Sequence, residues 1–229
     1  MSNYRIKIQY DGSRYRGWQR QQGEKNTIQG RIEQVLSKQM VFPVTIDGAG
    51  RTDAGVHAKE QVANFRLNTE KTTQQLQDVL NEYLPEDIRI LKVEEAGERF
   101  HSRLNATGKV YEYCLCKKDG FDVFGRKYMW QMDKELDVMR MKQAVEKLVG
   151  EHDFKGFCTK ASRKKSTVRN LYDITITEDE NRIYLTFYGS GFLYNMVRIL
   201  TGTLVEVGMG ERMAESIDEV FAKKERALA

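Results

Sequence analysis

The segment from Val44 to Leu67 reads VTIDGAGRTDAGVHAKEQVANFRL, and the predicted fold is built outward from it. Two expected strands, residues 44–47 and 61–67, flank a connection rich in glycine and alanine. Small residues allow another stretch of backbone, or a flat ligand, to approach closely. We therefore expect two strands joined by a tight, closely packed loop.

This loop carries one carboxylate, Asp53, with Arg51 two residues before it. A cation so close favours the ionised form of the acid. An ionised carboxylate on a rigid loop with little bulk around it can act as a nucleophile or as a base. The alternative is an Asx-type turn, in which Asp53 caps its own backbone, and the spacing alone favours that turn.

The first half of the chain has the predicted order β-α-β-β-α-β. Apolar residues recur at every second position in the expected strands and at every third or fourth position in the expected helices. The expected elements are a strand at 4–10, a helix capped by Asn26 or Thr27 with its apolar face at 28–36, strands at 44–47 and 61–67, a helix from Thr72 or Thr73 to Tyr83, and a strand near 88–93.

The second half repeats β-α-β-β-α and then has a short helix in place of a closing strand. The expected elements are a strand at 110–116, a helix from Asp133 or Asp137 to Val149 with Gly150 at C′, a hairpin of 171–177 and 182–188, a buried helix at 192–207 and a short helix at 213–223. Two such halves predict an α+β fold of two ferredoxin-like units, residues 1–105 and 106–229. Their mostly antiparallel sheets would lie side by side around a central cleft.

Charge is nearly balanced, with 37 Lys and Arg against 33 Asp and Glu, so composition alone does not indicate nucleic acid. The distribution is more suggestive, because cations beside aromatics suit the phosphates and unstacked bases of RNA. Solvated loops are the plain alternative for either cluster. One cluster holds Arg14, Arg16 and Arg20 with Tyr15 and Trp18, and the other holds Lys160, Arg163, Lys164, Lys165 and Arg169.

The three cysteines, Cys114, Cys116 and Cys158, form neither a disulfide framework nor a zinc-binding set. We expect small core hydrophobes in a reducing compartment. No apolar stretch approaches membrane-spanning length, and no signal peptide precedes Tyr4. The sequence therefore predicts a cytoplasmic protein without a membrane partner.

Four blocks, in order along the chain, resemble the TruA family of tRNA pseudouridine synthases. They are YDGSRYRGWQRQ (10–21), GRTDAGVH (50–57), FHSR (100–103) followed by KVYEY (109–113), and the segment 189–208 with Phe192, NMVR (195–198) and Gly202. The similarity extends from Tyr4 to about Ala229. One departure is the missing closing strand, whose leucine in the family helps to wall the uracil pocket. We expect an open strand edge there, or an edge covered by another segment or subunit.

The resemblance implies roles for the residues that match these motifs. Asp53 would be the catalytic carboxylate, and Arg198 would pair with it in the active site. Arg51 would displace the target base and hold the flipped nucleotide, while Tyr111 would stack on the flipped uracil. Apolar neighbours of Arg198 predict a mostly buried helix, where a cation needs a carboxylate partner. The expected substrate-binding set is completed by His57, Arg14, Arg16 and Arg20.

The implied activity is isomerisation of uridine to pseudouridine in the anticodon stem-loop of tRNA, at positions 38–40, by a homodimer whose RNA-binding cleft holds the substrate. No redox step occurs, so no cofactor is demanded. One rival is a paralogue that binds tRNA without catalysis. Another is a metal-dependent hydrolase built on Asp53 and His57, which lacks the ligand count. We expect His57 to be a loop hydrogen-bonder and expect no metal site.

Overall fold

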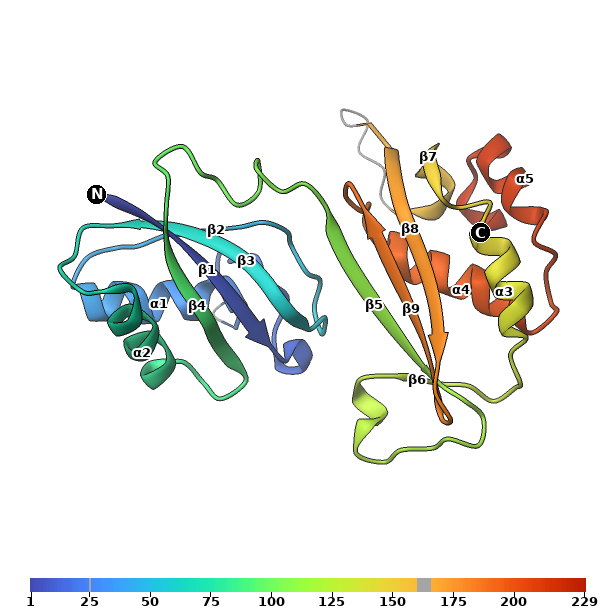
Figure 1. The fold of residues 1–229 in the computed structure, drawn as a ribbon, viewed down its shortest axis with the longest axis horizontal. Coiled ribbons are helices and arrows are strands. Elements are labelled where there is room, and N and C mark those ends of the chain that lie inside the picture. Colours follow the sequence, from blue (N-terminus) through green and yellow to red (C-terminus); the bar gives the residue numbers. More distant parts are fainter. Residues whose placement is uncertain (25, 160–165) are drawn as a thin grey trace. The chain divides into compact units, whose positions relative to one another are not determined.

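Alternating apolar and polar residues form the first strand, β1 (Ser2–Tyr10), as predicted. The computed structural model describes residues 1–24, 26–159 and 166–229, which divide into two units, Met1–Ala106 and Thr107–Ala229. Each unit places helices against a sheet (Figure 1), and the predicted α+β class is confirmed.

The first unit has the predicted element order, and its sheet has the strand order β2-β3-β1-β4 with antiparallel pairing throughout. Thr27 caps the first helix by accepting a hydrogen bond from the Gly30 amide at 3.2 Å, and a Thr72–Gln75 capping box begins the second. After β1 the elements are α1 (Ile28–Met40), β2 (Ile46–Gly48), β3 (Ala58–Leu67), α2 (Thr73–Tyr83) and β4 (Ile88–Ala96).

The core of this unit lies between the helices and one face of the sheet. Tyr4, Ile6 and Ile8 on β1 share a buried cluster with Ile32 on α1 and Leu80 on α2. Polar residues of β1 occupy the other face, where Arg5 pairs with Glu94 of β4 at 2.5 Å. The sheet therefore has one apolar and one charged side, as the alternation predicts.

The second unit has a five-stranded sheet in the order β6-β5-β9-β8-β7. Two of these strands are absent from the sequence prediction: β6, which pairs with β5 only at Leu115 and Cys116, and β7, which pairs with β8. The elements are β5 (Lys109–Cys116), β6 (Trp130–Gln131), α3 (Val138–Val145), β7 (Gly150–Asp153), β8 (Val168–Glu178), β9 (Arg182–Gly189), α4 (Met196–Gly208) and α5 (Ser216–Lys223).

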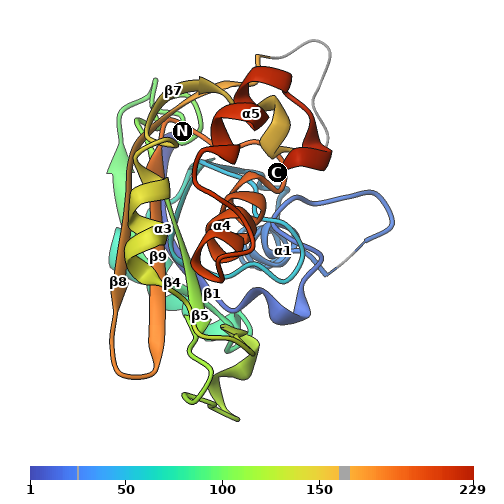
Figure 2. The same ribbon diagram turned by 90° about the vertical axis from the view of Figure 1, so that its right-hand side faces the viewer.

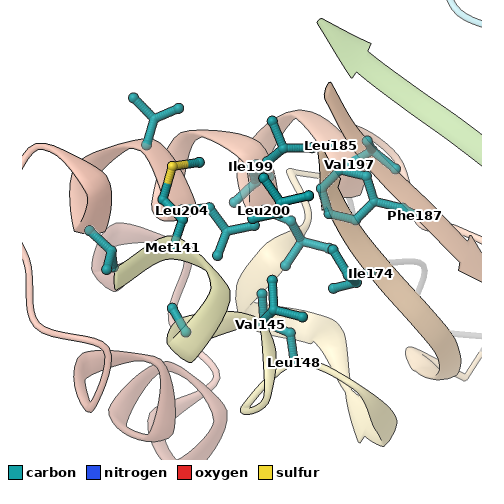
Figure 3. Packing of buried hydrophobic residues seen from close by; sticks show 14 of the residues in the cluster. Met141, Val145, Leu148, Ile174, Leu185, Phe187, Val197, Ile199, Leu200 and Leu204 are labelled. Carbon is teal, nitrogen blue, oxygen red and sulfur yellow. The ribbon is translucent and has the colours of Figure 1, made fainter. Parts of the chain in front are cut away.

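Helices α3 and α4 pack on one face of this sheet, and α5 packs near them (Figures 1 and 2). Figure 3 shows Met141 and Val145 of α3 meeting Leu200 and Leu204 of α4, with Phe187 of β9 beside them. The mostly apolar helix α4 is thus the centre of the unit's core. The prediction of a mostly buried helix is confirmed.

Two predicted helix boundaries are wrong. The third helix ends at Val145, so Gly150 is not its C′ residue; Gly150 begins β7 with a φ of 109°. The fourth helix begins at Met196 and not at Phe192, because Asn195 has a left-handed backbone with a φ of 59°. A residue in that conformation cannot continue a right-handed helix.

Candidate active site

The loop between β2 and β3 that carries Asp53 is held by the segment that follows β1. The Trp18 amide donates to the Thr52 carbonyl at 3.0 Å, and the Gly55 amide donates to the Tyr15 carbonyl at 3.4 Å. The hydroxyls of Tyr10 and Thr52 lie 2.8 Å apart. These bonds bracket Asp53 on both sides, so the position of its backbone depends on residues about 40 positions earlier.

Two glycines allow this close approach. A Cβ atom on Gly12 would lie 2.0 Å from the Val56 carbonyl oxygen, and one on Gly17 would lie 2.7 Å from the Thr52 oxygen. Gly17 also has a φ of 93°, which disfavours any other residue. The glycines of the 10–21 block are therefore required because two backbones touch there.

Trp18 fixes the same arrangement from the core side. Its indole is buried and lies against Gly48, where a Cβ would be 2.6 Å from the ring. Tyr15 is also buried, and its hydroxyl donates to Asp87. Burial, with this hydrogen bond, raises the pKa of Tyr15. The expectation that Tyr15 and Trp18 offer faces to RNA is wrong, because both rings belong to the core.

Asp53 itself is half-buried at the turn of its loop. Its main-chain oxygen accepts from the Val56 amide at 3.2 Å. Among the described residues, its carboxylate accepts no hydrogen bond and forms no ion pair, so the Asx turn is not formed. A carboxylate carried on a fixed backbone, yet not used to hold its own loop, is available to a ligand.

His57 binds the two segments together at the far end of the loop. Its Nδ1 accepts a hydrogen bond from the Gly12 amide at 3.1 Å, and the Asp11 carboxylate lies 3.0 Å from the same nitrogen. The prediction that His57 is a loop hydrogen-bonder is therefore confirmed by its geometry. Arg51 is exposed and lies outside ion-pair distance of every described acid, Asp53 included.

The three arginines of the first cluster differ in what they contact. Arg20 lies 3.0 Å from Glu33, a buried acid whose other oxygen accepts from the Ile46 amide at 3.0 Å. Arg14 and Arg16 are more exposed, and each lies 3.9 Å from one acid. Arg20 thus has a structural partner inside the unit, whereas Arg14 and Arg16 are held only weakly.

The second cluster falls mostly outside the described residues, which exclude Lys160, Arg163, Lys164 and Lys165. Arg169 is described, and its guanidinium donates to the main-chain oxygens of Ser166 and Val168 at 3.0 and 2.6 Å.

Two predicted site residues belong to the second unit. Tyr111 on β5 is half-buried, and its ring meets Phe192 edge to face with centroids 4.9 Å apart. This contact was not predicted, although Phe192 lies in a block that resembles the family. Arg198 is exposed on α4 and not buried, because it occupies the outer face of that helix.

The cysteines are free; Cys116 and Cys158 are buried and Cys114 is half-buried. Burial raises the pKa of the Cys114 thiol. In the described part of the chain, no group of three or more His, Cys, Asp or Glu residues is placed to hold a metal ion. None of the helices found there combines the length and apolar character that a membrane span requires.

Comparison with known proteins shows the family of the chain. A family model described as tRNA pseudouridine synthase matches residues 6–105 and 144–229. The chain belongs to this family. It is 45% identical over 229 residues to a tRNA pseudouridine synthase A of Bacillus sp. (strain KSM-64), covering 100% of this chain and 94% of that protein.

Two further relatives carry similar names. A tRNA pseudouridine synthase A 2 of Bacillus cereus (strain ZK / E33L) is 44% identical over 226 residues, which cover 99% of this chain and 92% of the relative. A tRNA pseudouridine synthase A of Clostridium kluyveri is 41% identical over 229 residues, covering 100% and 93%. The tRNA pseudouridine synthase family consists of isomerases, so the chain is an enzyme of that class.

The family match covers the Asp53 loop and the segment that holds it, and it also covers Arg198. Tyr111 lies in the stretch 106–143 between the two matched segments. The full-length relatives nevertheless align across that stretch.

Proposed function

We propose that this enzyme converts uridine to pseudouridine in the anticodon stem-loop of tRNA, at positions 38–40. The observation that carries the proposal is the state of Asp53: its loop is locked by the Gly12 and Gly17 contacts, while its carboxylate takes part in no hydrogen bond with the residues that the structure describes. Such an arrangement prepares a carboxylate to act on a bound nucleotide before that nucleotide arrives.

The isomerisation needs few groups besides an ionised carboxylate. The C1′–N1 bond breaks, a C1′–C5 bond forms, C5 loses a proton and N1 gains one, so substrate and product have the same atoms and electrons. Asp53 serves this sequence by attacking the sugar or the ring, or by taking a proton from the sugar. Each route needs an ionised carboxylate within reach of the reacting atoms.

The remaining residues suit the handling of a flipped base. Extrusion from a stem costs a few kcal/mol, and stacking on an aromatic face recovers about 1–3 kcal/mol per base. Tyr111 supplies that ring, and its contact with Phe192 fixes its orientation. Arg51 is an exposed cation two residues from Asp53 and would enter the space that the base leaves. Arg198, exposed on α4, would orient the Asp53 carboxylate.

The proposal extends to the assembly and its location. By its resemblance the enzyme acts as a homodimer in the cytoplasm, and the free cysteines suit a reducing compartment. Sedimentation velocity of the purified chain tests the dimer, because a monomer at micromolar concentration would contradict it.

Asp53→Asn tests the central assignment. We expect normal folding, retained tRNA binding and no release of tritium from tRNA labelled at C5 of uridine, because the amide keeps the shape and loses the ionised carboxylate that each route needs. Asp78→Asn is the control, since Asp78 is an exposed acid on α2 of the same unit. Native turnover by Asp53→Asn would refute the role of Asp53. A native enzyme that binds tRNA and releases no tritium would instead be the non-catalytic paralogue.

The position of the modified uridine needs its own measurement. Transcripts in which uridines 38–40 are replaced by cytidine should lose all tritium release. Release that persists from those transcripts would refute the proposed positions and would leave the reaction class intact.

A further inference from the structure

The segment from Gly120 to Trp130, here called the aromatic loop, presents large rings to solvent. Phe121 is 64% exposed, Phe124 92%, Tyr128 52% and Trp130 43%. The loop follows β5 in the second unit and ends at Trp130, the first residue of β6 (Figure 1, light green), and it lies in the stretch that the family model does not match. Single exposed apolar residues are ordinary, but four rings within eleven residues mark an interaction site.

The loop is ordered without burying these rings. The Asp122 carboxylate accepts from the Phe124 and Gly125 amides at 2.9 Å and from the Arg182 guanidinium at 2.8 Å. These contacts, led by the Gly125 amide, lower the pKa of Asp122. At the other end, the Gln131 side chain donates to the Lys117 carbonyl at 3.0 Å. Because the loop is already ordered, binding a partner costs little further conformational entropy of the loop.

The charge of the loop selects the kind of partner. Asp122 is its one acid, and Arg182 and the backbone already satisfy it. Arg126 and Lys127 are exposed, and neither forms an ion pair with a described residue. Within the loop, the charge left available is positive and lies between Phe124 and Tyr128. The hollow beside Phe121 is also lined by the acids Asp119, Asp179 and Glu180, so the phosphates are expected at the Arg126–Lys127 end. A protein partner would need acids placed opposite these two cations, whereas RNA brings a phosphate with every nucleotide.

We propose that the aromatic loop is a second RNA-binding element, which stacks unpaired bases of the tRNA on its rings and pairs the phosphates beside them with Arg126 and Lys127. Aromatic faces with adjacent cations are how proteins bind unstacked nucleotides. The element uses neither the Asp53 loop nor Tyr111. It rests on the proposed function only in that tRNA is the substrate.

The stacking half is tested with the double variant Phe121→Ser/Phe124→Ser. Both rings are mostly in solvent, so the fold should persist, as circular dichroism will show. We expect the Kd for an unmodified tRNA transcript to rise about fivefold or more, from the typical stacking contribution per base. The turnover number at saturating tRNA should be unchanged. Met213→Ser is the matched control, because Met213 is 74% exposed in the same unit and lies outside the loop.

The electrostatic half is tested with Arg126→Gln/Lys127→Gln. Each phosphate contact contributes about 0.7–0.9 to the slope of log K against log salt, so the slope should fall by about 1.4–1.8. The control is Lys142→Gln, which removes one of the two exposed cations on α3 and should change the slope little.

The outcomes separate this proposal from the catalytic one. Native Kd in the phenylalanine variant, or a native salt slope in the cation variant, overturns the RNA-binding role while tritium release by the native enzyme keeps the proposed function. Loss of a dimer in sedimentation by the phenylalanine variant also overturns it, because the loop would then bind a second copy of the chain. Absence of tritium release by the native enzyme refutes the catalytic proposal and leaves the Kd test of the loop valid.

Discussion

Replacing Gly12 by alanine should disable the enzyme from a position that carries no chemistry. Gly12 is buried beneath the Asp53 loop, and an added Cβ would lie 2.0 Å from the Val56 carbonyl oxygen. That oxygen is backbone and cannot turn aside as a side chain would. The two segments must therefore separate by about 1 Å or more to bring the contact to the roughly 3 Å that real structures tolerate.

The structure sets the size of the effect. A separation of about 1 Å would stretch the 3.1 Å bond between the Gly12 amide and His57 Nδ1 beyond hydrogen-bonding distance. Overpacking costs about 1–3 kcal/mol and the lost bond about 1 kcal/mol, so unfolding should be easier by about 2–4 kcal/mol. For a unit of this size, that lowers Tm by roughly 10 °C or more. A displacement of 1 Å at a catalytic group can cost about 100-fold in rate.

The assay compares Gly12→Ala with Gly97→Ala. Gly97 belongs to the same unit, and a Cβ there would meet nothing within 4 Å. Calorimetry gives Tm, and tritium release well below that Tm gives kcat/KM for the folded protein. We expect both Tm and kcat/KM to fall in Gly12→Ala. In Gly97→Ala we expect native kcat/KM and a free energy of unfolding within about 0.5 kcal/mol of the native value.

The result that would refute this reasoning is a Gly12→Ala protein with native Tm and native turnover. Close contact between the two backbones would then not be what positions Asp53. Lowered Tm with native turnover would refute only the catalytic part, because the Asp53 loop would then hold its geometry without the contact.

Three further predictions concern single groups. Tyr111→Phe should keep most activity and Tyr111→Ala should lose far more, measured as kcat/KM; if both substitutions were equally harmless, the ring would be a packing residue only. Exchanging Arg14 and Arg16 for glutamine should lower the salt slope of tRNA binding by about 1.4–1.8, whereas Arg20→Gln should mainly lower Tm because its acid partner is buried. Glu94 has its pKa lowered from 4.5 to about 2 by hydrogen bonds from its lysine and arginine partners. Its ionised form therefore stabilises the fold above pH 4.5, and the stability difference from Glu94→Gln should vanish as pH falls through about 2; a difference that persists there would contradict this.

Strands with strict alternation could be predicted from the sequence because their pattern has a single physical cause. Tyr4, Ile6 and Ile8 face the core, and the expected strand agrees with β1 within two residues at its start. The strands β6 and β7 have two and four residues and no alternation. Their pairing depends on partners far along the chain, such as His152 opposite Arg169, which no local pattern records.

Helix ends were harder to predict than helices because a single backbone angle decides them. The apolar run before α4 extends back to Phe192, yet the helix begins only after Asn195. Asn195 tolerates a left-handed backbone better than most residues, but nothing in its neighbours requires it there. The same limit applies to Arg198: the apolar residues around it predicted burial, while the helix turns this one side chain outward.

Rings among cations occur in two loops of this chain, and their structural roles are opposite. In the segment after β1 the ring of Trp18 is buried, because Gly48 lies across from it and leaves room for an indole. In the aromatic loop Phe124 remains almost wholly in solvent, while Asp122 and Arg182 hold the backbone beneath it. The two loops have similar sequence composition, and composition alone does not show that Gly48, far along the chain, makes room for the Trp18 ring. The first loop therefore uses its rings to place Asp53, and only the second has rings left to bind a base.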